Sequence, residues 1–157
     1  MYLSHTVTAF MDKCDVDYDT VGHSHSFTSG QSASAAQLPR SRLAKAVLFC
    51  DEDDYVLAVV PASAQVDRRA LKEMMGHKNL ELAEEDEVAL MFPDCELGAI
   101  PPLGGAYGLE TVVDDSLLEQ EEVYFEGGDH EHLVHVTRDA FLRLMAGAPH
   151  GNISGIN

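Results

Sequence analysis

The sequence predicts a single mixed α/β domain in which helices and strands interleave and some strands form antiparallel hairpins. The chain has 157 residues, the size of one ordinary domain, and it shows no internal repeat and no dividing linker. Short runs rich in β-branched residues alternate with segments whose apolar residues recur at helical spacing. We therefore expect one domain over residues 1–147, followed by a loose tail over 148–157.

The N-terminal part predicts two short helices and a short strand. Ser4 is a suitable cap for a helix with an apolar face, and residues 18–21 suit a strand. The run Ser29–Gln37 is rich in Ser and Ala and predicts a helix that ends before Pro39.

A β-hairpin follows, and it contains one lysine. Residues 42–50 and 55–60 are apolar and flank a polar turn, as in a hairpin. Alternation along the first strand places Lys45 on the same face as Val47 and Phe49. A lysine beside an apolar face either extends its ammonium to water or projects it into a cleft, and both alternatives stay open at this point.

The second half predicts three helices, three strands and a defined loop. Asp67 begins a helix that Gly76 ends, residues 84–92 form a helix up to Pro93, and Thr137 begins a last helix. Gly98–Gly105 is rich in Gly and Pro and predicts a loop. Strands are expected at 110–114, 122–125 and 132–136, with a turn at Gly127-Gly128.

The composition excludes several classes of protein. The formal net charge is −17, which argues against a general nucleic-acid-binding protein because phosphates would be repelled, and we expect no DNA partner. No apolar run reaches the length of about 20 residues that a membrane span needs. The three cysteines show no CxxC spacing, and we expect free thiols in a cytoplasmic protein. Basic residues concentrate between positions 40 and 72, where any contact with a polyanion is expected: Arg40, Arg42, Lys45, Arg68, Arg69 and Lys72.

No known catalytic or cofactor motif explains the chain. His23 and His25, and the group His130, His132 and His135, lack the partners of a zinc site, so we predict no metal and no cofactor. A GxSxG elbow, a P-loop and a dinucleotide fingerprint are missing from the sequence. What remains is Lys45, a rigid Gly/Pro loop and a Gly-Gly turn beside histidines, a set that suits capture of a small polar group.

The order of these elements resembles the YbaK family of aminoacyl-tRNA deacylases, which also occurs as the editing domain of prolyl-tRNA synthetase. The resemblance extends from about His23 to Met145. It is carried by five segments taken together: residues 42–47 (RLAKAV), 58–62 (AVVPA), 98–104 (GAIPPLG), 112–117 (VVDDSL) and 123–128 (VYFEGG).

This resemblance implies a curved mixed β-sheet flanked by helices and hydrolysis of the ester that joins a wrong amino acid to the 3′ end of tRNA. Lys45 corresponds to the key catalytic residue. A histidine after the Gly-Gly turn shapes the pocket; His132 is our first assignment and His130 the alternative. The implied substrate-binding residues are Gly98, Ala99, Ile100, Pro101, Pro102, Gly127, Gly128 and His130.

The resemblance also implies a reaction that uses water and the ribose hydroxyl of the substrate, without a metal. Aminoacyl-tRNA is then the partner, and an aminoacyl-tRNA synthetase is a candidate for delivering it. Two alternatives remain at the level of sequence. One is a noncatalytic protein that binds a small ligand or a partner through the same fold, and the other is a hydrolase of a different small ester. The sequence assigns no role to His23 and His25.

Overall fold

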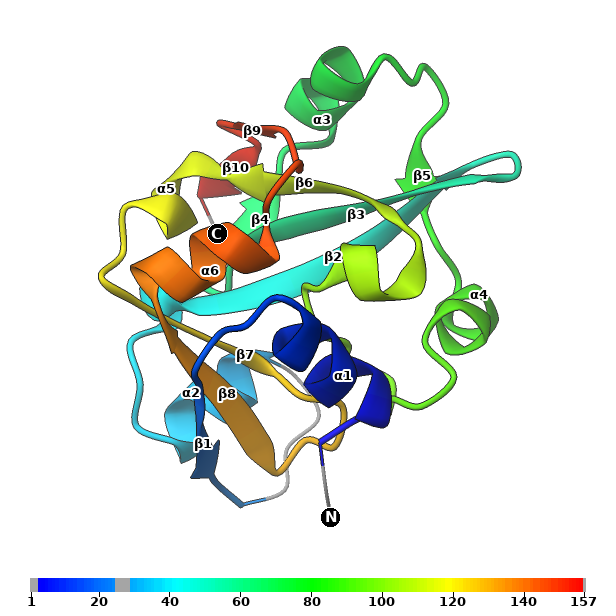
Figure 1. Cartoon of the computed structure of the whole chain (residues 1–157). Coiled ribbons are helices and arrows are strands. Elements are labelled where there is room, and N and C mark those ends of the chain that lie inside the picture. Colours follow the sequence, from blue (N-terminus) through cyan, green and yellow to red (C-terminus); the bar gives the residue numbers. More distant parts are fainter. Residues whose placement is uncertain (1–2, 25–28, 157) are drawn as a thin grey trace.

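The computed structural model describes residues 3–24 and 29–156, which form a mixed β-sheet with helices on both faces (Figure 1). This confirms the predicted mixed α/β domain. The sheet has eight strands among the described residues. Their order is β1 (Asp19–Gly22), β8 (His132–Thr137), β7 (Glu122–Glu126), β2 (Leu43–Asp51), β3 (Asp54–Pro61), β6 (Glu110–Asp114) and β9 (His150–Gly151), and β5 (Glu81–Leu82) pairs with the end of β2.

The strands pair in both directions. The predicted hairpin is confirmed, since β2 and β3 pair antiparallel from Ala44 opposite Pro61 to Asp51 opposite Asp54. β7 and β8 form a second antiparallel pair, to which β1 adds. Parallel pairs join β2 to β7, β3 to β6 and β6 to β9. The β2–β7 pair is short and consists of Leu43 opposite Tyr124 and Ala44 opposite Phe125.

The helices divide between the two faces of the sheet. One face is covered by α1 (His5–Lys13), α4 (Glu85–Met91), α5 (Asp115–Leu118) and α6 (Arg138–Leu144), and the other by α2 (Ser29–Ala35) and α3 (Arg68–Met75). Figure 1 shows α1 and α6 in front of the strands and α2 behind them. Short 3-10 helices form at η1 (Arg40–Arg42) and η2 (Gly104–Tyr107). The predicted caps are confirmed, because Ser4, Asp67 and Thr137 each accept a hydrogen bond from the first helical turn.

Alternation along the strands gives each face its own core. On the face of α1 and α6, residues such as Ala44, Val59 and Phe125 pack against Val7 and Phe141. On the opposite face, Phe49, Val56, Ala58 and Val60 pack against Leu71 of α3. Lys45 alternates with Leu43 and Val47, so it lies on the α2–α3 face, as predicted.

The C-terminal segment differs from the expected loose tail. β9 pairs with β6, and β10 (Ser154–Ile156) pairs antiparallel with β4 (Ala64–Val66). Between them Ile153 is 1% exposed, and its backbone N–H donates to the Asp114 carboxylate at 2.9 Å. Buried apolar contact and a charged acceptor hold the segment in place. Among the described residues no helix is both long and apolar enough to cross a membrane.

Candidate functional site

Lys45 lies beside a gap in the sheet. Along its first edge β2 pairs continuously with β3, but on its second edge it pairs with β7 only at Leu43 and Ala44 and with β5 only at Phe49 and Cys50. Within the described residues, no strand pairs with 45–48 on that second side. Lys45 itself is half-buried, and burial lowers the pKa of its ammonium.

The peptide groups of Ala46 face this gap. The Leu48 carbonyl accepts from the Ala83 N–H at 2.9 Å, so the even-numbered residues of β2 direct their backbone groups to the second edge. The N–H and C=O of Ala46 follow the same alternation. A donor and an acceptor of the main chain are therefore presented one residue from Lys45.

A pocket of about 340 Å³ opens at the same gap. Its walls come from β2, β5, α4 and the loop after α4, and most of its surface is apolar. Leu82 and Leu97 stand at its rim and are 52% and 43% exposed. The lining residues are Ala46, Val47, Leu48, Leu82, Ala83, Glu85, Val88, Leu97, Gly98 and Ile100.

The predicted Gly/Pro loop forms one wall of this pocket. Gly98 has φ +82°, a left-handed conformation that glycine adopts without strain. Ile100 lines the pocket with Gly98, whereas Ala99, Pro101 and Pro102 are buried behind it. The structure thus brings Gly98 and Ile100 to the gap beside Lys45 and gives the other three a supporting position.

The Gly127-Gly128 turn is hydrogen-bonded to the loop after α4 that contains Gly98. The Gly128 carbonyl accepts from the Glu96 N–H at 2.8 Å, and the Gly127 carbonyl accepts from the Ser4 N–H at 2.8 Å. Gly128 has φ +112°, and a Cβ on it would lie 3.3 Å from Cys95 Sγ. The turn is therefore packed between the start of α1 and the loop, and a larger residue would disturb that packing.

His130 and His132 occupy different environments. His130 is 2% exposed, has φ +61°, and lies in the loop before β8. Its Nε2 is 2.5 Å from the Leu97 carbonyl, which can only accept, so Nε2 carries the proton. The structure places His130 against the loop that contains Gly98.

His132 instead stabilises the turn. Its Nδ1 lies 2.7 Å from Asp129 Oδ2, and Asp129 also accepts from the backbone N–H groups of Glu131 and His132. Burial alone would raise the pKa of Asp129, but these hydrogen bonds outweigh it and hold that pKa below its usual value. The left-handed φ of His130 takes that residue out of the strand, so it does not share a strand face with His132.

Glu126 is a buried acid that the sequence pattern did not single out. It is 1% exposed and follows Phe125, the last β7 residue paired with β2, so it occupies the position next to Lys45 in register. Burial raises its pKa to about 7; the nearby Ser32 hydroxyl opposes the rise and Asp129 adds to it. Neither carboxylate oxygen has a donor in hydrogen-bond geometry within the described part of the chain. A glutamate at the end of a strand and before a Gly-Gly turn is expected to be exposed to water. The sequence pattern therefore did not predict that Glu126 is buried.

The cysteines near the site are not activated nucleophiles. Burial raises the pKa of the Cys95 thiol to about 11, and burial with neighbouring acids raises that of Cys50. Cys95 belongs to a network in which Tyr107 donates to Asp94 at 2.8 Å and Ser4 also donates to Asp94. This network ties the start of α1 to the loop after α4.

Metal-ligating side chains do not gather in the described residues. No group of three or more His, Cys, Asp or Glu there could hold a metal ion. His23 Nδ1 lies 2.7 Å from the Ser24 carbonyl, and His25 is outside the described residues.

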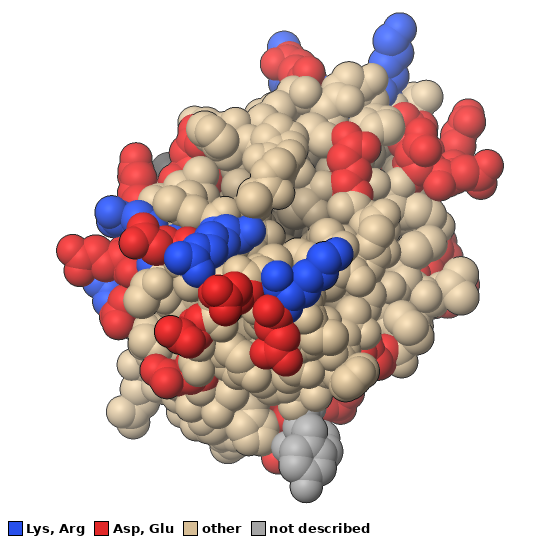
Figure 2. All heavy atoms as spheres, viewed as in Figure 1, with Lys and Arg blue, Asp and Glu red and all other residues tan. Residues whose placement is uncertain are grey.

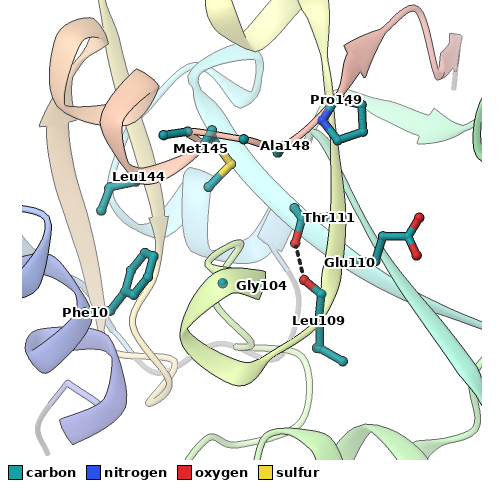
Figure 3. A pocket seen from close by; sticks show the side chains of 12 residues that line it. Phe10, Gly104, Leu109, Glu110, Thr111, Leu144, Met145, Ala148 and Pro149 are labelled. Carbon is teal, nitrogen blue, oxygen red and sulfur yellow. Dashed lines mark hydrogen bonds between the residues drawn. The ribbon is translucent and has the colours of Figure 1, made fainter.

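A second hollow, of about 290 Å³, lies on the α1–α6 face of the sheet (Figure 3). It is bounded by Phe10, Gly104, the end of α6 and Thr111, whose hydroxyl donates to the Leu109 carbonyl at 3.1 Å. Glu110 is its one ionisable lining residue. Because its lining residues include none of those beside the gap in the sheet next to Lys45, it is not our candidate for the site.

Comparison with solved structures places this fold among known proteins. The chain matches the crystal structure of a hypothetical protein, APE2540, with a TM-score of 0.84 and 21% identity over 96% of this chain and 100% of the other. It also matches a protein proposed as a trans-editing enzyme for prolyl-tRNA synthetase, with a TM-score of 0.80 and 22% identity over 98% and 99%. These similarities show the fold.

Sequence relatives cover the chain to different extents. Proline–tRNA ligase of Thermosipho africanus is 29% identical over 77 residues, 49% of this chain but 14% of the ligase. The uncharacterised protein YwhH of Bacillus subtilis is 28% identical over 113 residues, 71% of each chain. The family model of the aminoacyl-tRNA editing domain matches residues 23–144, a range that includes Lys45, the Gly98 loop and His130. The chain therefore belongs to the aminoacyl-tRNA editing domain family.

Proposed function

We propose that this chain is a trans-editing deacylase that hydrolyses the ester between a mischarged amino acid and the 3′ end of tRNA. The observation that carries the proposal is the half-buried Lys45 beside a gap in the sheet that opens into an apolar pocket. Family membership supports the substrate class, and the reaction would take place where translation occurs, in the cytoplasm.

The geometry suits an ester with a small amino-acid side chain. The apolar walls formed by Val88, Leu97 and Ile100 accommodate the side chain, and the Ala46 peptide groups can hydrogen-bond its polar atoms. Lys45 places a positive charge where negative charge develops on the carbonyl oxygen during attack by water. Because Lys45 is partly desolvated, that charge is less screened than it would be at the surface.

The remaining residues position these groups. The proton on His130 Nε2 is directed to the Leu97 carbonyl and fixes the loop wall. Gly127 and Gly128 hold the same loop through backbone hydrogen bonds. His132, bonded to Asp129, is assigned to the turn and not to the reacting ester. No step requires a covalent intermediate on Cys50 or Cys95.

The test is hydrolysis of a panel of mischarged tRNAs, beginning with those that prolyl-tRNA synthetase produces, because two of the relatives bear its name. Lys45→Ala is expected to lower kcat/KM by about 100-fold or more, the usual loss when an electrostatic contact to the transition state is removed. The matched control is Lys13→Ala at an exposed lysine of α1, outside the pocket, which should retain the wild-type rate.

A thermal melt checks that Lys45→Ala folds. A folded variant with the wild-type rate would remove Lys45 from the mechanism. A wild-type protein that hydrolyses none of the esters but binds an amino-acid-like ligand would favour the noncatalytic alternative.

A further inference from the structure

A second feature of the α2–α3 face is a basic hollow of about 640 Å³ at α3 and the residues after it. Its lining residues, which we call the α3 hollow, are Arg68, Arg69, Lys72, Glu73, Gly76, His77 and Lys78. Residues 68–78 contain four Lys or Arg and one acid, a formal charge of +3 in a chain whose total is −17. A concentration of positive charge in so acidic a protein points to an anionic partner.

The charge distribution elsewhere strengthens this reading. No Lys or Arg occurs between positions 79 and 137. Figure 2 shows acidic side chains spread over the visible face. Basic ones project at its upper edge, where Figure 1 shows α3, and others lie at its left and centre among acidic ones. A polyanion approaching the protein is therefore repelled over most of the surface and attracted at α3.

The α3 hollow lies on the same face as Lys45. Leu71 of α3 packs on Phe49, Val56, Ala58 and Val60, and the last of these is paired with Lys45. The Arg68 guanidinium lies over the Phe49 ring, 5.6 Å from its centroid, which holds the start of α3 against β2.

The hollow is also close to the pocket along the chain. Lys78 lines the hollow and Leu82 lines the pocket, so the backbone between them spans at most about 14 Å. Leu82 is paired with Phe49, the residue beneath Arg68. A flexible single-stranded RNA whose 3′ end lies in the pocket can therefore pass over the hollow within a few nucleotides of that end.

We propose that the α3 hollow binds the phosphodiester backbone of the tRNA acceptor end while the terminal ester occupies the pocket beside Lys45. The inference rests on the proposed function for the identity of the RNA. Arg69 and Lys72 neutralise phosphates as charges on flexible stems, and Arg68 adds a guanidinium whose position is fixed by Phe49. Glu73 opposes binding, because its carboxylate lies 3.6 Å from Arg69 Nε.

The experiment measures the affinity of uncharged tRNA for the full chain across a salt series. Arg69→Glu is expected to weaken binding about tenfold and to reduce the slope of log K against log salt by about one, since a phosphate contact is lost. Arg69 is chosen over Arg68 because it is highly exposed and has no packing role. Glu73→Gln is expected to strengthen binding about twofold, because it releases Arg69 from its ion pair.

Lys13→Glu is the matched control, with the same change of charge at an exposed lysine of α1 on the opposite face. It should change affinity by less than about twofold. Equal weakening by Lys13→Glu and Arg69→Glu would overturn the proposal in favour of nonspecific attraction. Unchanged affinity in Arg69→Glu would overturn it in favour of a contact elsewhere or of delivery by a partner.

Hydrolysis of a minimal aminoacyl ester of adenosine separates this inference from the proposed function. Arg69→Glu should hydrolyse it at the wild-type rate, because the hollow contacts only the nucleotides that this substrate lacks. Loss of activity on the minimal ester would show that Arg69 supports the pocket, which contradicts the inference. The binding assay needs no catalysis, so it remains decisive even if the wild type hydrolyses nothing.

Discussion

Glu126 is an acidic side chain buried in the interior of the fold. A carboxylate that is 1% exposed is unfavourable in its ionised form, and the nearby Ser32 hydroxyl offsets only part of that cost. Burial therefore favours the protonated carboxyl, and the pKa of Glu126 rises from 4.5 to about 7. The folded state therefore binds one more proton than the unfolded state between these two values.

This difference predicts the sign of a pH effect on stability. Because the folded pKa is raised, the contribution of Glu126 is fully favourable below about pH 4.5 and is lost as pH rises to about 7. Glu126→Gln keeps the size of the side chain and removes the titration. At pH 8 the variant should be more stable than the wild type by about 3 kcal/mol, and at pH 4 the two should be similar.

The measurement is the free energy of unfolding by denaturant for both proteins at intervals between pH 4 and pH 8.5. Taking the difference cancels every titrating group that the two share. A difference that stays constant over this range would show that Glu126 is not protonated on folding.

At the same scale, the sequence predicted the strand face of Lys45 and left the histidine after the Gly-Gly turn open between His132 and His130. Strand alternation was enough to place Lys45 with Val47 and Phe49, because the hairpin is regular. The position of His130 depends on its left-handed φ of +61°. A glycine at this position would have predicted such a conformation, but an Asp-His dipeptide does not. Its contact with Leu97 joins loops far apart in the sequence, so no local pattern contains it.

At the scale of elements, the Gly98 loop combines a backbone requirement with a place in the pocket. Gly98→Val introduces a β-branched side chain at φ +82°, which is strained, and it fills space at the pocket wall. Ile100→Val removes only a methylene from the same wall. We expect Gly98→Val to lower kcat/KM for deacylation of the mischarged tRNA at least tenfold. Ile100→Val should change that kcat/KM by less than about threefold.

Comparing the two variants with the same substrate checks this expectation, and circular dichroism confirms that both fold. Equal rates would mean that the loop is a surface connection and not a wall of the site.

Most elements were predicted because their signals are local. The caps at Ser4, Asp67 and Thr137, the polar turn of the hairpin and Gly76 each act within one turn of chain. β9 and β10 have two and three residues, too short for a periodic pattern, and they form through partners in β6 and β4. The parallel pairs of β2 with β7 and β3 with β6 are likewise set by tertiary packing and not by local sequence.

At the scale of the whole molecule, four of the described histidines form separate pairs with acids. His77 lies 3.0 Å from Asp51, His132 2.7 Å from Asp129, and His150 2.6 Å from Asp115. His135 lies between Asp19 and Glu122 at 3.2 and 3.1 Å and stacks on Tyr124. Each imidazole is thereby oriented by a neighbour, and these pairs stand apart from one another along the described chain.

This arrangement predicts that hydrolysis does not depend on a bound metal. Dialysis against a strong chelator should leave both the rate and the melting temperature unchanged, because zinc needs three or four converging ligands. Elemental analysis of the purified protein provides the control. One equivalent of zinc whose removal stops turnover would contradict the prediction and would point to ligands that come together only with substrate.

The short β2–β7 pair has a consequence for the time course of folding. It is the junction between the strands β2, β3 and β6 and the strands β7, β8 and β1, and it connects positions 43–44 to 124–125. Closing so long a loop for two residue pairs carries a high entropic cost before any contact offsets it, so such junctions form late. Lys45 and Glu126 lie one residue beyond that junction. We infer that each half of the sheet becomes ordered before the site exists, so recovery of activity should lag behind recovery of secondary structure during refolding.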